Sequence, residues 1–242
     1  MKRCALVFVL LSSAAGCTVA PPETGINDPY EPFNRQVHAF NKSLDQAVLR
    51  PLARAGGHAP EGLGEPVVNF AGNAGLPGTV VNNLLQGDIG GAATNTLRFL
   101  VNTTVGLAGL ADPASAIGLH EVETDFGATL ARWGVPEGAY LELPVLGPST
   151  ERDATGRVVD LLLDPLDRLD RVPREMRDYA LPAQLAEEAI DRARLGATFD
   201  DVLYGSADSY AQARLIYLQN RRFELGEDQA SEDRYINPYE DQ

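Results

Sequence analysis

The sequence predicts an all-α fold, and two observations lead to this prediction. Apolar residues recur at helical spacings of three and four near the start of the chain: Phe33, Val37, Phe40, Leu44 and Val48. Glycine and proline interrupt residues 121–160 every few positions, so we expect short extended pieces around 140–145 but no sheet. The sequence therefore favours a single helical domain over residues 27–223, with little or no β structure.

The first residues have the layout of an export signal. Lys2 and Arg3 precede a short apolar run over 5–11, and small residues lead to Cys17. Small residues directly before a cysteine indicate a lipoprotein cleavage site, so we predict a signal peptide over 1–16, acylation of Cys17 and a tether over 17–26. The alternative is ordinary cleavage nearby, which leaves the thiol of Cys17 free.

The charge of the chain limits its partners. The formal net charge is −14, and removal of residues 1–16 takes away two positive charges. A surface this acidic repels the phosphates of nucleic acid and excludes a broad electrostatic grip on anionic lipid. After cleavage Cys17 is the single cysteine, so no internal disulfide can form.

The first predicted helix has start and stop signals of its own. Asp28 suits the N-cap, Pro29 the first helical position, and Glu31 the position that closes a capping box. Arg50 and Pro51 mark its end or a kink. We expect the apolar residues of this helix to pack against other helices, with channel lining as the alternative.

Residues 66–120 are unusually poor in charge. Only Asp88, Arg98 and Asp112 carry a formal charge over these 55 residues, and the spacing predicts helices over 77–86 and 89–107. Soluble helices normally carry a charged outer face, so this segment is either buried or surrounded by an apolar environment. Arg98 needs a partner, and Asp112 or Asp88 is the natural one. In the plainer interpretation its asparagines are helix caps and satisfied core amides: Asn69, Asn73, Asn82, Asn83, Asn95 and Asn102.

The remaining third of the chain is charged and helical. We expect helices over 158–163, 182–195 and 208–223, followed by a disordered acidic tail over 224–242. The three histidines lack metal-ligand spacing, and Gly147-Pro148-Ser149 is a turn pattern, not a nucleophile elbow. His120 beside the carboxylates of 121–125 is either an acid–base pair or a solvated helix cap, and we favour the cap. We expect no cofactor and no enzyme activity.

Ordered motifs along much of the chain resemble the MlaA family, also called VacJ, of outer-membrane lipoproteins. The resemblance is dense from Asn27 to Pro165, whereas residues 168–203 match only in helical character. It rests on the run Asn27-Asp28-Pro29-Tyr30-Glu31-Pro32-Phe33-Asn34-Arg35, and on Phe40-Asn41, Asn69-Phe70, Asn82 to Asp88, Arg98-Phe99, Asn102-Thr103 and Asp125-Phe126-Gly127-Ala128-Thr129-Leu130.

The resemblance implies a ring-like helical body in the periplasmic leaflet of the outer membrane, beside trimeric porins. An amphipathic channel would let mislocalised phospholipids leave the outer leaflet for a soluble MlaC-like periplasmic carrier. A non-transporting scaffold that binds porins or other envelope proteins is the alternative. The candidate channel or structural residues are Asn27, Asp28, Pro29, Phe33, Asn34, Phe40, Asn41, Asn69, Phe70, Asn82, Asp88, Arg98 and Asn102.

Overall fold

A computed structural model describes residues 25–51, 53, 64–163, 190, 192 and 194–227, and every structural statement below concerns these residues. The predicted signal peptide, Cys17 and most of the predicted tether lie outside them. So do most of the helix expected over 182–195 and residues 228–242 of the predicted tail.

The described chain is mainly helical, as predicted. Its first half holds α2 (Glu31–Leu44), a π-helical turn η1 (Asp45–Leu49), α4 (Glu65–Leu85), α5 (Ile89–Thr104) and the short α6 (Pro113–Ala116). Its second half holds α7 (Phe126–Arg132), strands β1 (Tyr140–Leu143) and β2 (Gly147–Thr150), α8 (Glu151–Leu163), α10 (Gly196–Asp200), a second π-helical turn η3 (Asp201–Gly205) and α11 (Ser209–Glu224).

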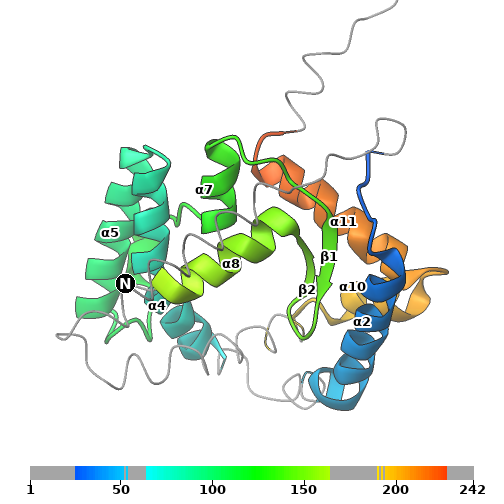
Figure 1. The fold of residues 1–242 in the computed structure, drawn as a ribbon. Helices are drawn as coiled ribbons and strands as arrows, with labels where there is room; N and C mark the ends of the chain where they lie inside the picture. Colours follow the sequence, from blue (N-terminus) through cyan, green and yellow to red (C-terminus); the bar gives the residue numbers. More distant parts are fainter. Residues whose placement is uncertain are drawn as a thin grey trace, which may run out of the picture.

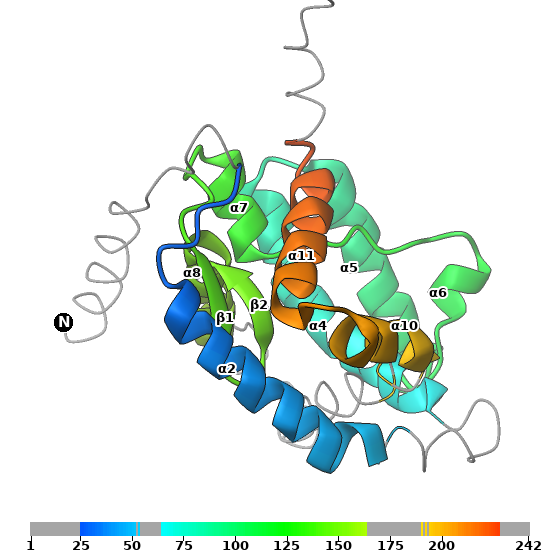
Figure 2. The ribbon, with the colours of Figure 1, turned by 90° about the vertical axis from the view of Figure 1, so that its right-hand side faces the viewer.

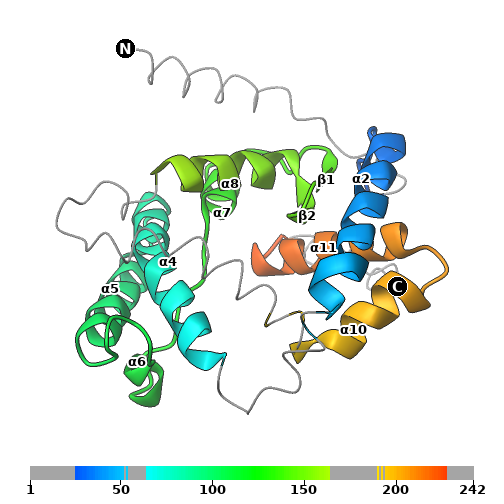
Figure 3. The same cartoon turned by 90° about the horizontal axis from the view of Figure 1, so that it is seen from below.

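The elements form two sides joined by a bridge. The α4–α5 pair lies on one side, α2 and α11 lie on the other, and α8 with the β-hairpin stands between them (Figures 1 and 3). The helices α7 and α8 cross closely, because a Cβ atom on Gly156 would lie 2.3 Å from the backbone nitrogen of Gly127. A small apolar core of Tyr140, Tyr210 and Leu218 joins the hairpin to α11.

The structure corrects the predicted start of the first helix. The helix begins at Glu31 after Tyr30, and no side chain caps it, so Asp28 is not its N-cap and Pro29 is not its first residue. The side chain of Asp28 instead accepts a hydrogen bond from Asn34 (2.9 Å) and bonds to α11. The carboxylate of Asp28, which the local sequence predicts as a helix cap, therefore makes long-range contacts instead.

Other boundaries differ from the prediction as well. Helix α4 begins at residue 65, not 77, and continues through Pro77, while α8 begins at Glu151, not 158. Helix α5 stops at Thr104 because Leu107 and Ala108 adopt left-handed backbone angles, φ +56° and +61°. One two-stranded antiparallel sheet forms where we expected none, with Tyr140 opposite Thr150. The expected α11 is confirmed, with Asp208 accepting a hydrogen bond from Ala211 as its N-cap.

Candidate lipid-facing surface

The α4–α5 pair buries amides alongside Leu76 and small apolar side chains. The side chain of Asn95 donates to the Asn83 side-chain oxygen and to the Val122 carbonyl, both at 2.9 Å. It also accepts from the Val122 backbone nitrogen (3.1 Å), so one side chain satisfies both backbone groups of residue 122. Asn95 and Asn83 are at most 1% exposed. The buried side of α5 therefore binds the backbone of a later segment of the chain, at Val122.

The segment bound in this way is residues 105–124, which we call the strap. Asn102 donates to Asp112 (2.9 Å) and accepts from the backbone nitrogen of Ala114 (3.1 Å). Earlier in the strap, the Asn69 side chain of α4 reaches the carbonyl of Leu110 (3.3 Å). These bonds give the non-helical backbone partners inside the protein, which is the condition for irregular backbone at membrane depth.

Arg98 lies at the centre of the strap contacts. It pairs with Asp112 (3.1 Å), as predicted, and it also donates to the Ser115 hydroxyl (3.0 Å) and to the Leu119 carbonyl. Asp88 has another role, because it caps α5 by accepting from Gly91 (2.9 Å). Burial acts to raise the pKa of Asp112, but hydrogen bonds from Ser115 and Asn102 and the charge of Arg98 outweigh it and lower the pKa to about 2.

A second set of polar contacts joins this pair of helices to the rest of the molecule. Asn82 of α4 accepts from Thr129 of α7 (3.0 Å) and donates to Asp160 of α8 (2.9 Å). Gln86 donates to Thr124 (2.6 Å) and Thr129 (2.9 Å). Burial raises the pKa of Asp160, although hydrogen bonds from Phe126 and Asn82 act against it.

The outer surface of the same region is apolar. Trp133 is 52% exposed, and its indole nitrogen donates to the Leu85 carbonyl at the end of α4 (3.1 Å). Twelve large apolar residues are exposed on α4, α5, the strap and the end of α7: Val81, Leu84, Leu85, Ile89, Leu97, Leu100, Val105, Leu107, Leu110, Ile117, Val122 and Trp133. Exposed apolar residues in this number, where they adjoin, are typical of a surface for lipid, a ligand or another protein.

Helix α2 has the same reversed arrangement. Phe33 and Phe40 are 62% and 52% exposed, so the prediction that they pack against other helices is wrong, whereas Val37 of the same apolar stripe is buried. The buried side of α2 also carries polar groups: Asn34 donates to the Tyr140 carbonyl (3.0 Å) and accepts from the Glu142 backbone nitrogen (3.0 Å). Two turns further on, Asn41 bonds to the backbone of the hairpin at Leu143 and Val145. A polar set with the same spacing as the apolar one faces the protein.

One cluster resembles a catalytic triad in its distances. The two ring nitrogens of His38 lie 3.1 Å from the Ser209 hydroxyl and 3.2 Å from a Glu142 carboxylate oxygen. The Ser209 hydroxyl is also within 3.4 Å of the Lys42 ammonium, and Glu142 accepts from Tyr140 (2.5 Å). His38 and Glu142 are 6% and 3% exposed. The cluster thus joins α2, β1 and α11, and its side chains form hydrogen bonds with one another.

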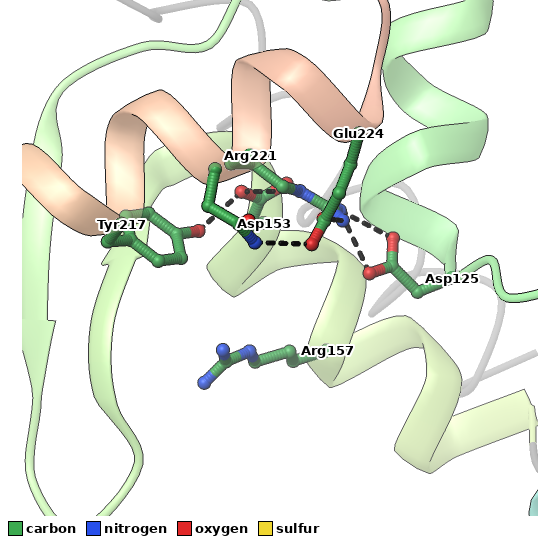
Figure 4. A pocket seen from close by; sticks show the side chains of 7 residues that line it. Asp125, Asp153, Arg157, Tyr217, Arg221 and Glu224 are labelled. Atoms are coloured by element: carbon green, nitrogen blue, oxygen red, sulfur yellow. Dashed lines mark hydrogen bonds and ion pairs between the residues drawn. The ribbon is translucent and has the colours of Figure 1, made fainter. Parts of the chain in front are cut away.

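A pocket of about 210 Å³ lies where α7, α8 and α11 meet (Figure 4). Arg221 crosses it and binds Asp125 (2.7 Å), Asp153 (3.1 Å) and Glu224 (3.2 Å). Asp125 also caps α7 by accepting from Ala128 (2.7 Å), which agrees with the cap interpretation of the 121–125 carboxylates. The acidic groups of this pocket all bind Arg221. The pocket therefore marks the place where α7, α8 and α11 are joined, and we call it the joint.

The structure places the predicted site residues differently. Internal bonds described above are made by Asp28, Asn34, Asn41, Asn69, Asn82, Asp88, Arg98 and Asn102. For Asn69, Asn82 and Asn102 this agrees with the plainer interpretation of the asparagines. Pro29, Phe33 and Phe40 are exposed, Phe70 is half-buried, and Asn27 is buried, with its carbonyl accepting from Tyr140 (2.7 Å). A channel role for any of them stays a prediction, and Cys17 lies outside the described residues.

Sequence reasoning missed the residues that complete these networks. His38, Glu142, Thr129 and Asp160 were not among the candidates. Glu142 accepts from the candidate Asn41, Thr129 and Asp160 bond to the candidate Asn82, and His38 is linked to Asn41 through Glu142. The available signal was the stripe Asn34, His38, Asn41 and Asp45, which has the same helical spacing as the apolar stripe. Among the residues that the structure describes, no group of His, Cys, Asp or Glu could hold a metal ion, and no helix is both long and apolar enough to cross a membrane.

Comparison with known proteins settles the family. The model of the MlaA lipoprotein family matches residues 26–224. The chain belongs to the MlaA lipoprotein family. It is 33% identical over 206 residues to the Shigella flexneri "Intermembrane phospholipid transport system lipoprotein MlaA", covering 83% of this chain and 79% of that protein. An uncharacterised Rickettsia bellii protein is 36% identical over 198 residues, 81% of this chain and 76% of its own length.

The MlaA fold is also found among solved structures. One reported as "Structural basis for maintenance of bacterial outer membrane lipid asymmetry" matches with a TM-score of 0.67 at 31% sequence identity. The match covers 82% of this chain and 98% of the other. The helical MlaA fold of this chain is therefore shared with a protein of known structure.

Proposed function

We propose that this protein transports phospholipids at the outer membrane and so maintains the lipid asymmetry of that membrane. The observation that carries the proposal is the reversed arrangement of α2 and the α4–α5 pair, which bury polar groups and expose apolar ones. Such an exterior suits lipid acyl chains, as a soluble protein would bury it. Family membership and the names of the relatives support the same function, which is transport and not enzymatic catalysis.

The energetics of lipid transfer explain why such a surface is needed. Burying a methylene group is worth about 0.8 kcal/mol, so moving a two-chain phospholipid into water costs on the order of 20 kcal/mol. A transporter must keep the chains against apolar surface while polar groups meet the headgroup. We infer an amphipathic passage through a ring-like body that sits in the periplasmic leaflet, with phospholipids entering from the outer leaflet.

The same proposal names an anchor and partners. Acylation of Cys17 would tether the chain to the periplasmic face of the outer membrane, and the apolar surface of the body would strengthen that attachment. Trimeric porins would lie beside the body, and a soluble MlaC-like carrier would receive the phospholipid in the periplasm. The porins would contact the body within the membrane, and the carrier would contact it from the periplasm.

A deletion strain tests the transport function. Cells that lack the protein, and any parallel pathway, should accumulate phospholipid in the outer leaflet and become sensitive to detergent, and a plasmid copy should reverse both effects. Normal lipid asymmetry in the deletion strain would refute transport. If asymmetry is normal in the deletion strain and the tagged protein, restored from a plasmid, recovers porins on purification, the scaffold function is the correct one.

A substitution tests the anchor separately. Cys17→Ala should abolish incorporation of labelled palmitate, because the thiol that accepts the lipid is gone. Ser12→Ala in the same signal region is the matched control and should leave labelling intact. Labelling of the Cys17→Ala protein at the wild-type level would place the lipid elsewhere.

A further inference from the structure

Two tyrosines, Tyr204 of η3 and Tyr210 of α11, hold the two ends of α2 in the same manner. Tyr210 has the guanidinium of Arg35 4.6 Å from its ring centre and that of Arg214 at 5.2 Å. Tyr204 has Arg50 at 4.5 Å and the Lys42 ammonium at 5.2 Å. Each ring thus has two cations close to it, at distances that favour cation–π attraction.

Each tyrosine also donates its hydroxyl to a buried aspartate. Tyr210 donates to Asp28, just before α2, and Tyr204 donates to Asp45 in η1 (2.7 Å). Burial, followed by the bonded aspartate, raises the pKa of both tyrosines, so each stays a donor. We call the two sets of contacts the clasps.

An arginine completes each clasp. Arg214 pairs with Asp28, and Arg192 pairs with Asp45 (2.7 Å) and Asp200 (2.6 Å). The clasps are not fully satisfied, because the Nε atoms of Arg214 and Arg50 are buried without a hydrogen-bond partner. Leaving a buried donor unpaired destabilises the closed state, which makes release easier.

The clasps lie along one seam, between α2 with η1 and the segment 192–214. Figure 2 shows these elements on one side of the molecule. Further ionic contacts join the seam at its exposed edge, Arg35 with Asp208 (2.8 Å) and Arg50 with Asp200 (2.7 Å). Both sides carry a π-helical turn, η1 and η3, and such turns are frequent at functional sites. The seam is therefore fastened largely by charges. It brings together five cations and five carboxylates among the described residues, including Glu31, which pairs with Arg35 and Arg214.

We propose that this seam is a lateral opening of the protein, through which the zwitterionic headgroup of a phospholipid passes. The proposal rests on the transport function. When the clasps part, the headgroup phosphate can take the place of an aspartate at an arginine, and an ammonium group can take the place of an arginine at an aspartate. Each broken ion pair is thereby replaced, whereas an apolar seam would expose hydrocarbon to the headgroup.

A cysteine pair across the seam tests the opening. Arg35→Cys with Asp208→Cys, joined by a short bis-maleimide, should lose phospholipid transport between vesicles compared with the same variant left unlinked. The matched control is Leu146→Cys with Arg157→Cys, an exposed neighbouring pair between the hairpin turn and α8. Linking the control pair should not change its transport. Full transport by the linked seam variant would overturn the proposal.

Two further results keep the test decisive. If neither the unlinked variants nor the wild-type protein transports phospholipid, the proposed transport function itself is refuted. Loss of transport on linking the seam alone supports the opening. In the double variant Tyr204→Phe with Tyr210→Phe, both hydroxyl bonds are lost while the rings remain. Its α2 amides should exchange hydrogen faster, with the β-hairpin unchanged. Exchange in α2 equal to wild type would show that the clasps do not hold the seam.

Discussion

The α4–α5 pair with its strap and the α7–α8–α11 joint around Arg221 bury polar groups in two different ways. The first uses neutral amides, with a single ion pair at Arg98 and Asp112. The second uses one arginine among three carboxylates, of which Asp125 and Glu224 are nearly half exposed. Charges need nearby water or several partners, whereas amides can be satisfied in an apolar environment. The difference separates a region suited to lipid from one suited to water.

The largest effect should come from removing the arginine at the charged joint. Arg221→Met removes the nearer cation of Asp153, whose side chain is 4% exposed, and leaves only the longer contact with Arg152 (3.8 Å). Breaking a buried pair from one side costs about 3–5 kcal/mol of unfolding free energy. Unfolding by denaturant in detergent micelles measures it. Arg222→Met, which separates a more exposed pair with Glu137, is the control and should cost about 1 kcal/mol or less. Equal losses would contradict the central role of Arg221.

The amide network should be nearly as sensitive. Asn95→Leu keeps the side-chain size but leaves both backbone groups of Val122 unpaired, and each such group costs about 1–3 kcal/mol. We expect a loss of about 3 kcal/mol in the same unfolding measurement. Asn69→Leu removes one longer bond at a more exposed site and should cost much less. If the two substitutions lowered the unfolding free energy equally, the strap would not depend on its hydrogen bonds to Asn95.

The outer surfaces of the two regions should respond differently to a charge. Leu100 of α5 and Ile216 of α11 are 52% and 47% exposed, so they form a matched pair. A carboxylate among acyl chains costs about 2.5–3.5 kcal/mol, so Leu100→Asp should reduce the fraction of protein that floats with vesicles. Ile216→Asp should change that fraction much less. Equal effects would mean that the two surfaces share one environment.

The smallest effect concerns acid. The pKa of Asp112 is lowered from 3.8 to about 2, so its contribution to stability is complete above pH 3.8 and is lost as the pH falls towards 2. The unfolding midpoint of wild type should therefore decrease over this range. Asp112→Asn should show a shallower decrease, with other carboxylates accounting for the remainder. Parallel curves for the two proteins would exclude Asp112 as a source of acid sensitivity.

Much of the fold could be predicted because helical spacing is a local property. The class, α5, α11 and the pairing of Arg98 with Asp112 all follow from residues near one another in the chain. The orientation of α2 could not be predicted in this way. Its apolar and polar stripes have the same period, and only the surroundings decide which stripe faces inward. The prediction that Phe33 and Phe40 pack inside the protein assumed that the outer side of α2 faces water.

The partners of the asparagines also set an order of assembly. The bonds of Asn95, Arg98 and Asn102 reach at most 27 residues along the chain, so the contacts between α5 and the strap can form early. Those of Asn34, His38 and Asn41 within the hairpin and α11 span 101 to 171 residues. Contacts this distant form late, because closing the intervening loop costs entropy first. We therefore expect α2 of the newly made chain to remain with its polar stripe unpaired until the hairpin and α11 have been synthesised, which makes it a segment that a chaperone would protect.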